Sequence, residues 1–409
     1  MKTNITYPYK FKLKPTEEQR EVFRQYAGTR RYLWNNMLDE RNKTYEYTGS
    51  SPSMYKQKKR LTKLKNNSEE HEWMKDIHSQ VLQEAVRDLD SAFSNFFNKS
   101  HGYPNFKSKK EIKQTFRFPQ GVKVDGRKVY LPKIGWIRFY KSQNIEGEIK
   151  SATVKRQANG WFILINTEQE IEVEWKTKVD KNNIVGIDLG LKDFAVMSDG
   201  TKVNPPKYLR EMEDKLIREQ RKLSRKEYGS ENWKKQKRIV AKIHADIRSK
   251  RQDFLHKLSS TIVAENQCVV VEDLNVKGMT QNHNLAKSIH DASWSEFVRM
   301  LEYKCQWSGT YFVKIDRFEP SSKTCRHCGV INDIELSDRT FECSGCGAEL
   351  MRDYNASLNI KRKGIEILAG RADHQSKKAS GETTSGHTNG GMIEVESLNE
   401  EPSGVAKVA

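Results

Sequence analysis

Three acidic residues, each within a short motif, are the side chains of this sequence best suited to do chemistry. Asp188 lies in VGIDLGLKDFAVMSDG, Glu272 in CVVVEDLNVKGM and Asp353 in MRDYNASLNI. Asp188 and Glu272 belong to apolar runs that read as buried strands, where a bare charge is costly unless it is paired or holds a cation. Three such carboxylates brought together would hold hard divalent metals, as phosphodiester cleavage by two metals requires. The sequence therefore predicts two catalytic Mg²⁺ ions at these residues.

Four cysteines form a second constellation, between Glu272 and Asp353. Cys325 and Cys328 make one CxxC pair, and fourteen residues separate it from a second pair, Cys343 and Cys346. This spacing is typical of a zinc ribbon. A redox dithiol is the weaker interpretation because both pairs are present. Four thiolates leave no coordination position open for a substrate, so we expect one structural Zn²⁺ here.

The composition indicates a polyanionic partner. The chain of 409 residues has a formal net charge of +18 and a pI of about 9.4. Nucleic acid is favoured over a membrane surface, because no amphipathic segment stands out as a membrane binder and no run of about 18 apolar residues exists. The first residues lack the apolar core of a secretory signal. We therefore expect a cytoplasmic protein.

Regular patterns in the first half of the chain predict a barrel with an inserted helical unit. Residues 1–15 alternate apolar and polar side chains, as in a strand. A capping box from Thr16 to Gln19 then begins a helix, and a second helix is expected over 78–98. Residues 112–175 return to strand patterns separated by Gly and Asn turns. The first strand and these later strands should close into a β-barrel around the inserted helices.

An α/β pattern begins near residue 183. NIVGIDLG reads as a buried strand with DFAVMSDG as its hairpin partner, and QCVVVEDL reads as a later buried strand. Basic helices are expected over about 205–260, followed by the helix DASWSEFVRMLEYKCQWSG, the strand YFVKID and a last helix that begins at Asp353. Residues 370–409 are rich in Gly, Ser, Thr and Glu with little apolar content, which predicts a disordered tail.

The order of the three acidic residues matches the plan of ribonuclease H-like nucleases. In that plan an Asp ends the first strand, a Glu ends a later central strand, and an Asp begins a late helix. Asp188 would bridge both metals, with Glu272 and Asp353 each completing one shell. Asp273 should point to the opposite side of its strand from Glu272. A turn or a helix cap is the commoner explanation for any single Asp, so the prediction depends on the combination.

Basic side chains are candidates for contacts with nucleic acid. One group falls just before the strand that carries Glu272, where a phosphate backbone would pass: Arg248, Lys250, Arg251, His256 and Lys257. A solvated helix face is the alternative for each of them alone. Two further candidates, Lys323 and Arg352, flank the cysteine module. The segments TRRYLWNNM and GYPNFKSKK combine aromatic and basic residues that suit base stacking and phosphate binding.

Taken together, these motifs resemble the TnpB family of transposon-encoded RNA-guided DNA endonucleases, ancestral to compact type V CRISPR effectors. The matching motifs run in order along nearly the whole chain: KFKLKPTEEQ, GTRRYLWN, FFNKSHGYPNFKSKK, YLPKIGW, GIDLGLKDFAVMSDG, KRQDFLHKLS, VEDLNVKGM, SWSEFVRMLEYK, FEPSSKTCRHCG, CSGCG and RDYNASLNI. Asp188, Glu272 and Asp353 match the family's catalytic positions one by one. One departure precedes Asp353: the family usually reads His-Asp-Arg-Asp, whereas this chain reads Leu-Met-Arg-Asp and lacks an accessory acidic position.

The resemblance implies a multidomain fold with α+β and α/β parts. Its expected parts are a wedge β-barrel domain (1–15 and 112–178), a helical recognition domain (16–111), an RNase H-like (RuvC) nuclease domain (179–320 and 351–369), a zinc-ribbon target-nucleic-acid-binding insert (321–350) and the tail (370–409).

The resemblance also implies partners and an activity. These are a guide RNA from the transposon end, double-stranded target DNA beside a short flanking motif, and Mg²⁺-dependent cleavage by a monomeric ribonucleoprotein. Ser79, Gln80 and Gln83 fall on the helix that faces the flanking duplex, where Gln can pair with adenine. An RNA-guided repressor without cleavage is one alternative, which the three retained carboxylates disfavour. A compact type V CRISPR effector would share all these motifs, and a transposase fits less well because no end-recognition domain is found.

Overall fold

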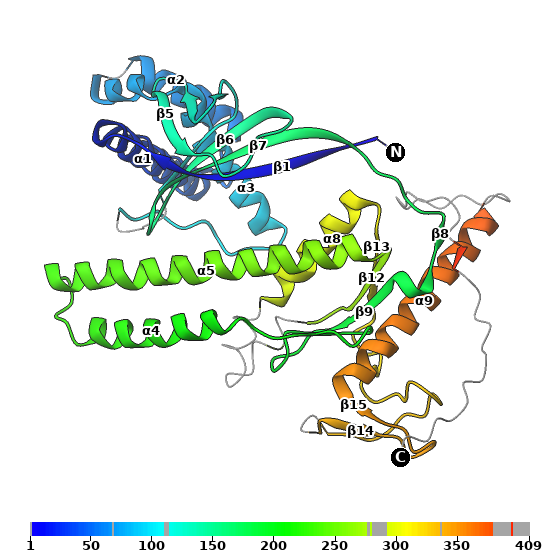
Figure 1. Ribbon diagram of the computed structural model, residues 1–409. Helices are drawn as coiled ribbons and strands as arrows, with labels where there is room; N and C mark the ends of the chain where they lie inside the picture. Colours follow the sequence, from blue (N-terminus) through cyan, green and yellow to red (C-terminus); the bar gives the residue numbers. More distant parts are fainter. Residues whose placement is uncertain are drawn as a thin grey trace. The chain divides into compact units, whose positions relative to one another are not determined.

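The computed structural model divides the chain into two compact units (Figure 1). It describes residues 2–67, 69–109, 114–275, 279, 293–335, 338–378 and 394–395. The amino-terminal unit comprises Thr3–Ile171 and Lys226–Ala245, and the second, here called the carboxylate unit, comprises Met1–Lys2, Glu172–Arg225 and Asp246–Ala409. Of the described helices, none combines the length and apolar content needed to cross a bilayer.

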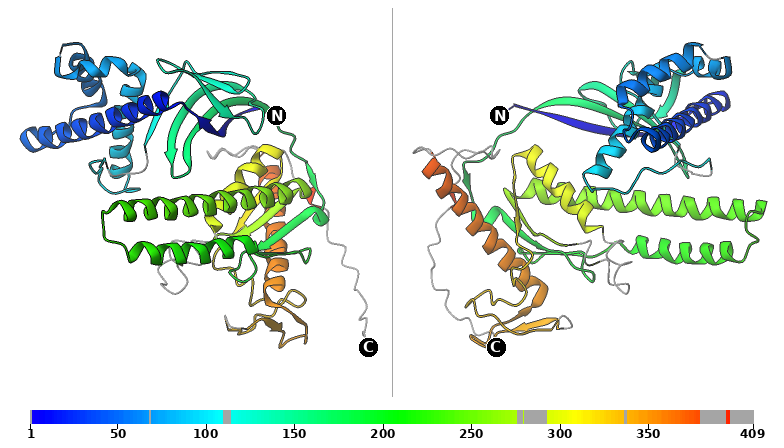
Figure 2. Two further views of the ribbon diagram at one scale, coloured as in Figure 1. Left: turned by 60° about the vertical axis from the view of Figure 1, so that its left-hand side comes forward. Right: turned by 180° about the vertical axis from the view of Figure 1, so that it is seen from behind.

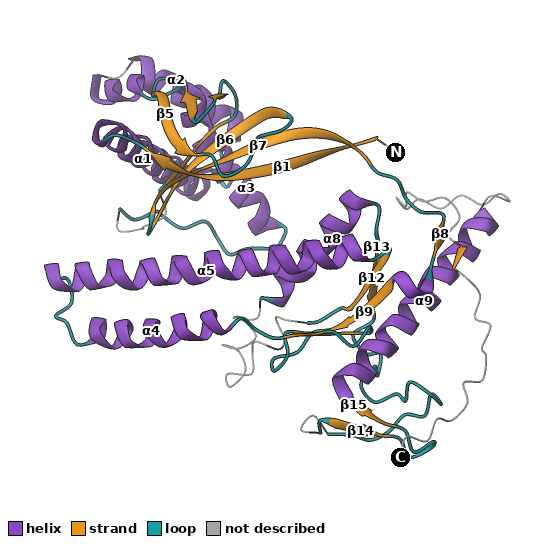
Figure 3. Cartoon of the chain, in the orientation of Figure 1, coloured by secondary structure: helices purple, strands orange, loops and turns teal. Residues whose placement is uncertain are grey.

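A curled seven-stranded sheet and its helices share one core in the amino-terminal unit (Figure 3). The strand order is β2-β6-β7-β1-β5-β4-β3, with β1 (Lys2–Lys14), β2 (Thr115–Phe118), β3 (Lys123–Asp125), β4 (Lys128–Leu131), β5 (Gly135–Tyr140), β6 (Glu148–Gln157) and β7 (Gly160–Glu172). The helices are α1 (Glu17–Thr48), α2 (Met54–Asn67) and α3 (Ser79–Phe97), with a 3₁₀ turn over Glu69–Asp76. Phe23 and Tyr26 of α1 pack against Phe116 of β2, with ring centroids 5.6 and 5.1 Å apart. The first strand thus joins the later strands, as predicted.

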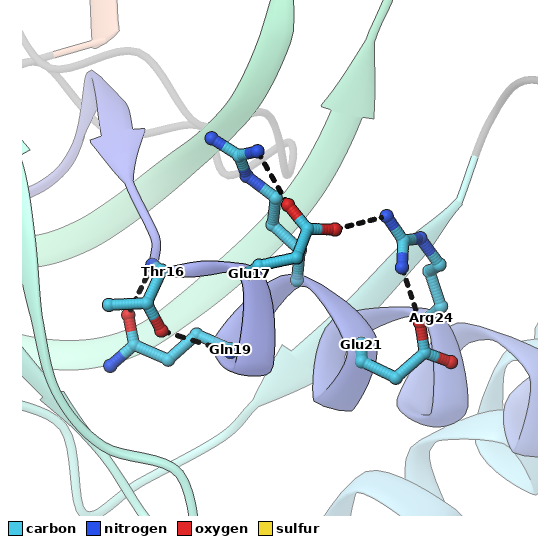
Figure 4. Close-up of polar contacts among 6 residues, drawn as sticks. Thr16, Glu17, Gln19, Glu21 and Arg24 are labelled. Carbon is cyan, nitrogen blue, oxygen red and sulfur yellow. Dashed lines mark hydrogen bonds and ion pairs between the residues drawn. The ribbon is translucent and has the colours of Figure 1, made fainter.

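Helix α1 begins at the predicted capping box (Figure 4). The Thr16 hydroxyl accepts a hydrogen bond from the Gln19 amide at 3.2 Å, and the Gln19 side chain accepts one from the Thr16 amide at 3.1 Å. These bonds satisfy two of the amides that a helix start leaves unpaired. One turn later, Arg24 bridges Glu17 and Glu21. The boundary between β1 and α1 is therefore set by local sequence.

A five-stranded mixed sheet is the centre of the carboxylate unit. Its order is β11-β10-β9-β12-β13, with β9 (Ile184–Asp188), β10 (Ala195–Met197), β11 (Lys202–Val203), β12 (Cys268–Glu272) and β13 (Tyr311–Ile315). Strands β9, β10 and β11 are antiparallel, whereas β12 runs parallel to both β9 and β13. The predicted turn at Asp199 and Gly200 joins β10 to β11, with Gly200 at a φ of 89°. Each strand predicted in this half of the chain is therefore present.

Helices cover both faces of this sheet (Figure 2). The covering helices are α5 (Glu231–Glu265), α8 (Trp294–Ser308) and α9 (Arg352–Lys378), and α4 (Lys207–Ser224) follows β11 along the chain. Val269 and Val271 pack with side chains of α5 and α8, whereas Cys268 and Val270 pack with side chains of α9. Because β12 is buried on both faces, its sequence is a continuous apolar run rather than an alternating one.

The chain between β13 and α9 forms a small module with one hairpin of its own, β14 (Thr340–Glu342) and β15 (Glu349–Met351). Helix α9 continues to Lys378, past residue 370, where we expected the tail to start. Within the predicted tail, β16 (Glu394–Val395) pairs in parallel with β8 (Lys178–Val179). The rest of the predicted tail lies outside the described residues.

Candidate metal centres

Asp188 and Glu272 end two neighbouring parallel strands. Ile187 of β9 pairs with Val271 of β12, so Asp188 and Glu272 come next to each other at the carboxyl ends of these strands. Alternate residues of a strand point to the same face. Glu272 therefore shares the face of Val270, which packs against α9. By the same alternation Asp188 shares the face of Gly186, which also lies against α9.

Two glycines allow α9 to lie against these strands. A Cβ atom on Gly186 would stand 2.3 Å from the carbonyl oxygen of Ser357 and 2.5 Å from the amide nitrogen of Lys361. A Cβ atom on Gly364 would stand 2.3 Å from a methyl carbon of Val270. Any other residue at either position would push the helix away from the sheet. The close packing brings the first turn of α9, with Asp353, towards the ends of β9 and β12.

The carboxylates of Glu272 and Asp353 act electrostatically on Asp188. Burial, then the carboxylates of Glu272 and Asp353, raise the pKa of Asp188 to about 8, while the Arg352 guanidinium acts in the opposite direction. Burial also raises the pKa of Glu272, and a hydrogen bond from Ser321 lowers it. Half-buried carboxylates close to one another repel, and binding either a proton or a cation relieves this repulsion. All the donors are hard oxygens, so the site fits Mg²⁺.

Two of the carboxylates also have protein partners that we did not predict. The Ser321 hydroxyl donates a hydrogen bond to Oε1 of Glu272. Arg352 donates from Nε and Nη2 to Oδ1 of Asp353, at 3.2 and 3.1 Å. Arg352, predicted to contact nucleic acid, thus lies against a carboxylate of the centre. Asp273 comes directly after β12, which ends at Glu272, and forms an ion pair with Arg317 at 2.5 Å.

The four cysteines of the module come together. The Sγ atoms of Cys325 and Cys346 lie 3.7 Å apart, and those of Cys328 and Cys343 lie 3.4 Å apart. The ligand atoms of all four cysteines lie within 4.8 Å of one another. Among the described residues, no other group of three or more His, Cys, Asp or Glu side chains is gathered this closely. The three carboxylates are therefore less tightly gathered than the thiols. Four thiols at this spacing fit one tetrahedral Zn²⁺.

The backbone of the module supports this geometry. The amide of Cys325 donates to the carbonyl of Val330, and the amide of Cys343 donates to that of Ala348. Gly329 and Gly347 close the two turns with φ angles of 76° and 69°, in the region that favours glycine. Both CxxC pairs thus sit on equivalent tight turns. A Cβ atom on a third glycine, Gly345, would stand 2.9 Å from a methyl carbon of Val330.

The predicted nucleic-acid contacts lie on α3 of the amino-terminal unit and on α5 and the cysteine module of the carboxylate unit. On α5, Arg251 is partly buried, and the other four are exposed: Arg248, Lys250, His256 and Lys257. On α3, Ser79 and Gln83 are exposed, and the Ser79 hydroxyl accepts a hydrogen bond from Lys65 at 2.7 Å. Gln80 is partly buried, and its side-chain oxygen has no hydrogen-bond partner. Lys323 is partly exposed and pairs with Asp333 at 3.0 Å. Their roles remain predictions.

The amino-terminal unit contains a cationic cavity that was not predicted from the sequence. It has a volume of about 1010 Å³, and its described lining includes ten Lys or Arg side chains and no Asp or Glu. Aromatic rings accompany the cations: Lys14 lies 3.9 Å from the ring centre of Tyr140, and Lys237 lies 4.7 Å from that of Trp233. Cations interleaved with aromatic faces suit single-stranded nucleic acid. The lining comes from β1, α1, β5–β7, residues 228–242, Gln114 and Lys109, which belongs to the predicted segment GYPNFKSKK. The other segments are too far apart in sequence to form a recognisable motif.

Comparisons with known proteins agree with these features. Residues 164–283 match the OrfB_IS605 family model, described as "Probable transposase". Residues 294–360 match "Cas12f1-like, TNB domain". Residues 1–50 match a model described as "Helix-turn-helix domain", although here they form β1 and the single long helix α1.

Two bacterial relatives match over most of their length. "Putative RNA-guided DNA endonuclease InsQ" of Escherichia coli (strain K12) is 34% identical over 379 residues, which are 88% of this chain and 93% of that protein. A "Putative RNA-guided DNA endonuclease" of Streptomyces pristinaespiralis is 36% identical over 375 residues, which are 90% and 92%. The chain belongs to the TnpB/OrfB_IS605 family.

A solved structure has a similar fold. The protein in the cryo-EM structure of the Cas12f1–sgRNA–target DNA complex is 18% identical to this chain, with a TM-score of 0.50. The similarity covers 85% of this chain and 83% of that one.

Proposed function

We propose that this protein is an RNA-guided DNA endonuclease that cuts both strands of a target paired with its guide RNA. The convergence of Asp188, Glu272 and Asp353 on the α9 face of the mixed sheet carries the proposal. The arrangement follows the ribonuclease H-like plan: an Asp on the first strand, a Glu on a later central strand and an Asp at the start of a late helix. Residues 179–320 and 351–369 would form the RuvC-type nuclease domain, and residues 321–350 would be its zinc-ribbon insert.

The chain's own residues would hold the metals and the scissile phosphate. Asp188 interacts with both other carboxylates, so we assign it the position that bridges two ions, with Glu272 and Asp353 each binding one. Bound Mg²⁺ would supply an activated water for in-line attack and would stabilise the leaving 3′ oxygen. The four-cysteine zinc would take no part in this chemistry, because its ligands leave no open position.

A guide RNA would supply the sequence specificity. A protein with a charge of +18 binds nucleic acid without choosing a site, and its affinity falls steeply with salt. The relatives with matching length are named RNA-guided DNA endonucleases, and the cationic cavity of the amino-terminal unit offers a surface for RNA. Pairing of the guide with one DNA strand would expose the other strand to the carboxylates. The same centre would then cut both strands in succession.

Reconstitution with the co-purifying RNA tests this proposal. The complex should cut a matched target that carries the flanking motif in the presence of Mg²⁺. The Asp188→Ala, Glu272→Ala and Asp353→Ala complexes should bind the target normally without cutting. Protein stripped of RNA by ribonuclease and high-salt washing should cut no specific site. Cleavage by Asp188→Ala at the wild-type rate would refute the site, and site-specific cleavage by RNA-free protein would refute the guide. Binding without cleavage by the wild-type complex would instead favour a repressor.

A further inference from the structure

A buried polar network joins Glu272 to the four-cysteine module. The Ser321 hydroxyl, which donates to Glu272, belongs to a side chain that is only 6% exposed. Ser321 lies in the loop between β13 and Cys325. The side-chain amide of Asn359 on α9 donates to the carbonyl oxygens of Ser321 and Thr324, at 2.8 and 2.6 Å. The loop that carries Ser321 is thus fixed to the same helix that carries Asp353.

A second asparagine extends this network to the first cysteine pair. Asn355, fully buried on α9, donates to the Thr324 carbonyl at 2.8 Å and accepts from the amide of Arg326 at 3.1 Å. Arg326 lies inside the first CxxC pair, directly after Cys325. The conformation of that pair and the position of the loop are therefore tied to the same two side chains of α9.

We propose that Ser321 is a positioning residue for Glu272, and that the folded cysteine module supports it through Asn355 and Asn359. This inference rests on the proposed function of the carboxylates. Glu272 ends a strand, and its two carboxylate oxygens can rotate towards solvent unless something holds one of them. A hydroxyl donor on Oε1 leaves Oε2 directed to a cation, as partners of metal ligands commonly do. Zinc in the module would then affect metal affinity at the carboxylates, although it is not a ligand there.

Manganese binding to the full-length, RNA-free protein tests the positioning role directly. Free Mn²⁺ is followed by electron paramagnetic resonance, and binding by Asp188→Ala is subtracted as the background. Ser321→Ala should weaken Mn²⁺ binding roughly 10-fold and slow guided cleavage by about 10- to 100-fold, as loss of such partners does elsewhere. Its guided DNA binding and zinc content should stay unchanged. The matched control is Ser322→Ala, since no hydrogen bond of the adjacent Ser322 hydroxyl is found among the described residues. It should match the wild type.

Ser321→Cys provides a second variant of nearly the same size with a much weaker donor. This variant tests the positioning role if Ser321→Ala fails to fold. Its Mn²⁺ affinity should also be several-fold lower than that of the wild type. Mn²⁺ affinity and cleavage within twofold of the wild type in a folded Ser321 variant would overturn the positioning role. If Asp188→Ala cuts normally, the proposed function fails instead. If Asp188→Ala does not cut and Ser321→Ala has wild-type Mn²⁺ affinity and cleavage, the positioning role is refuted and the proposed function stands.

A double-mutant cycle tests the link to zinc. Cys346→Ser should abolish zinc binding and weaken Mn²⁺ binding about as much as Ser321→Ala does. The double variant should be no weaker than either single variant, because both changes remove the same support. Normal Mn²⁺ affinity in Cys346→Ser, or full additivity in the double variant, would overturn the link.

Discussion

Replacing Asp188 by asparagine should make the metal-free protein more stable at pH 8, although it should destroy the proposed metal site. Burial, together with Glu272 and Asp353, raises the pKa of Asp188 to about 8 from an ordinary value of 3.8. The folded protein therefore holds a proton that the unfolded chain has already released. The contribution of Asp188 to the free energy of unfolding is complete below its pKa in the unfolded chain. This contribution is lost as the pH rises through its pKa in the folded protein. Asparagine does not ionise, so it avoids this loss.

The size of the effect follows from the shift. At pH 8 the shift of the Asp188 pKa from 3.8 to about 8 corresponds to an upper limit of about 5 kcal/mol of unfolding free energy. Asp188 keeps partial exposure to solvent, which reduces the effect, so we expect about 2 kcal/mol. For a unit of about 200 residues, this would raise the unfolding midpoint by roughly 4–8 °C. The gain should shrink towards pH 4, where Asp188 becomes protonated in both states.

Scanning calorimetry of the RNA-free protein in a chelator, at pH 5 and pH 8, measures this difference. Saturating Mg²⁺ should reverse the order of the variants, because a bound ion stabilises only the chain that binds it. Asp273→Asn is the matched control: it removes a carboxylate next to Glu272 that pairs with Arg317, and it should change the midpoint little at either pH. A midpoint for Asp188→Asn at or below that of the wild type at pH 8 in the chelator would refute the reasoning.

Three further predictions concern other parts of the chain. Purified protein should contain one zinc per chain by elemental analysis, and Cys328→Ser should lose it and expose the module to proteolysis; zinc-free wild-type protein would contradict this. Gly186→Ala should destabilise the carboxylate unit by about 2–4 kcal/mol in denaturant titration, because its Cβ would meet the backbone of α9, whereas Gly102→Ala, with open space around it, should be neutral. Exchanging Ser79, Gln80 and Gln83 should alter the flanking motif selected from a randomised library, and an unchanged preference would remove these residues from motif reading.

Local signals explain which elements could be predicted from the sequence. The capping box at Thr16 depends only on residues three apart, and the strands of Asp188 and Glu272 are short apolar runs bounded by turn residues. The CxxC pairs are equally local, since each occupies one tight turn. These features need no knowledge of the rest of the fold.

The remaining features depend on contacts between distant segments. Ser321 meets Glu272 across 49 positions of sequence, and nothing in a serine's neighbours indicates such a partner. Gly186 and Gly364 read as ordinary glycines until the packing of α9 shows that a side chain would not fit. Arg352 was predicted to contact nucleic acid, because Asp353, its partner in the structure, was expected to bind only metal. Helix α2 has no clear sequence signal of its own, because its many charged side chains conceal any apolar stripe.

The cysteine module has a further consequence for the chain that runs through it. The module occupies the whole excursion between β13 and α9, and both ends of that excursion are anchored in the carboxylate unit. Closing a loop costs conformational entropy that grows with the logarithm of its length. Zinc at the two CxxC turns would divide the excursion into shorter loops, with Cys325 held close to Cys346. Residues inserted between the two pairs would then lengthen only the inner loop, so the tip of the module could change in size while Asp353 kept its place.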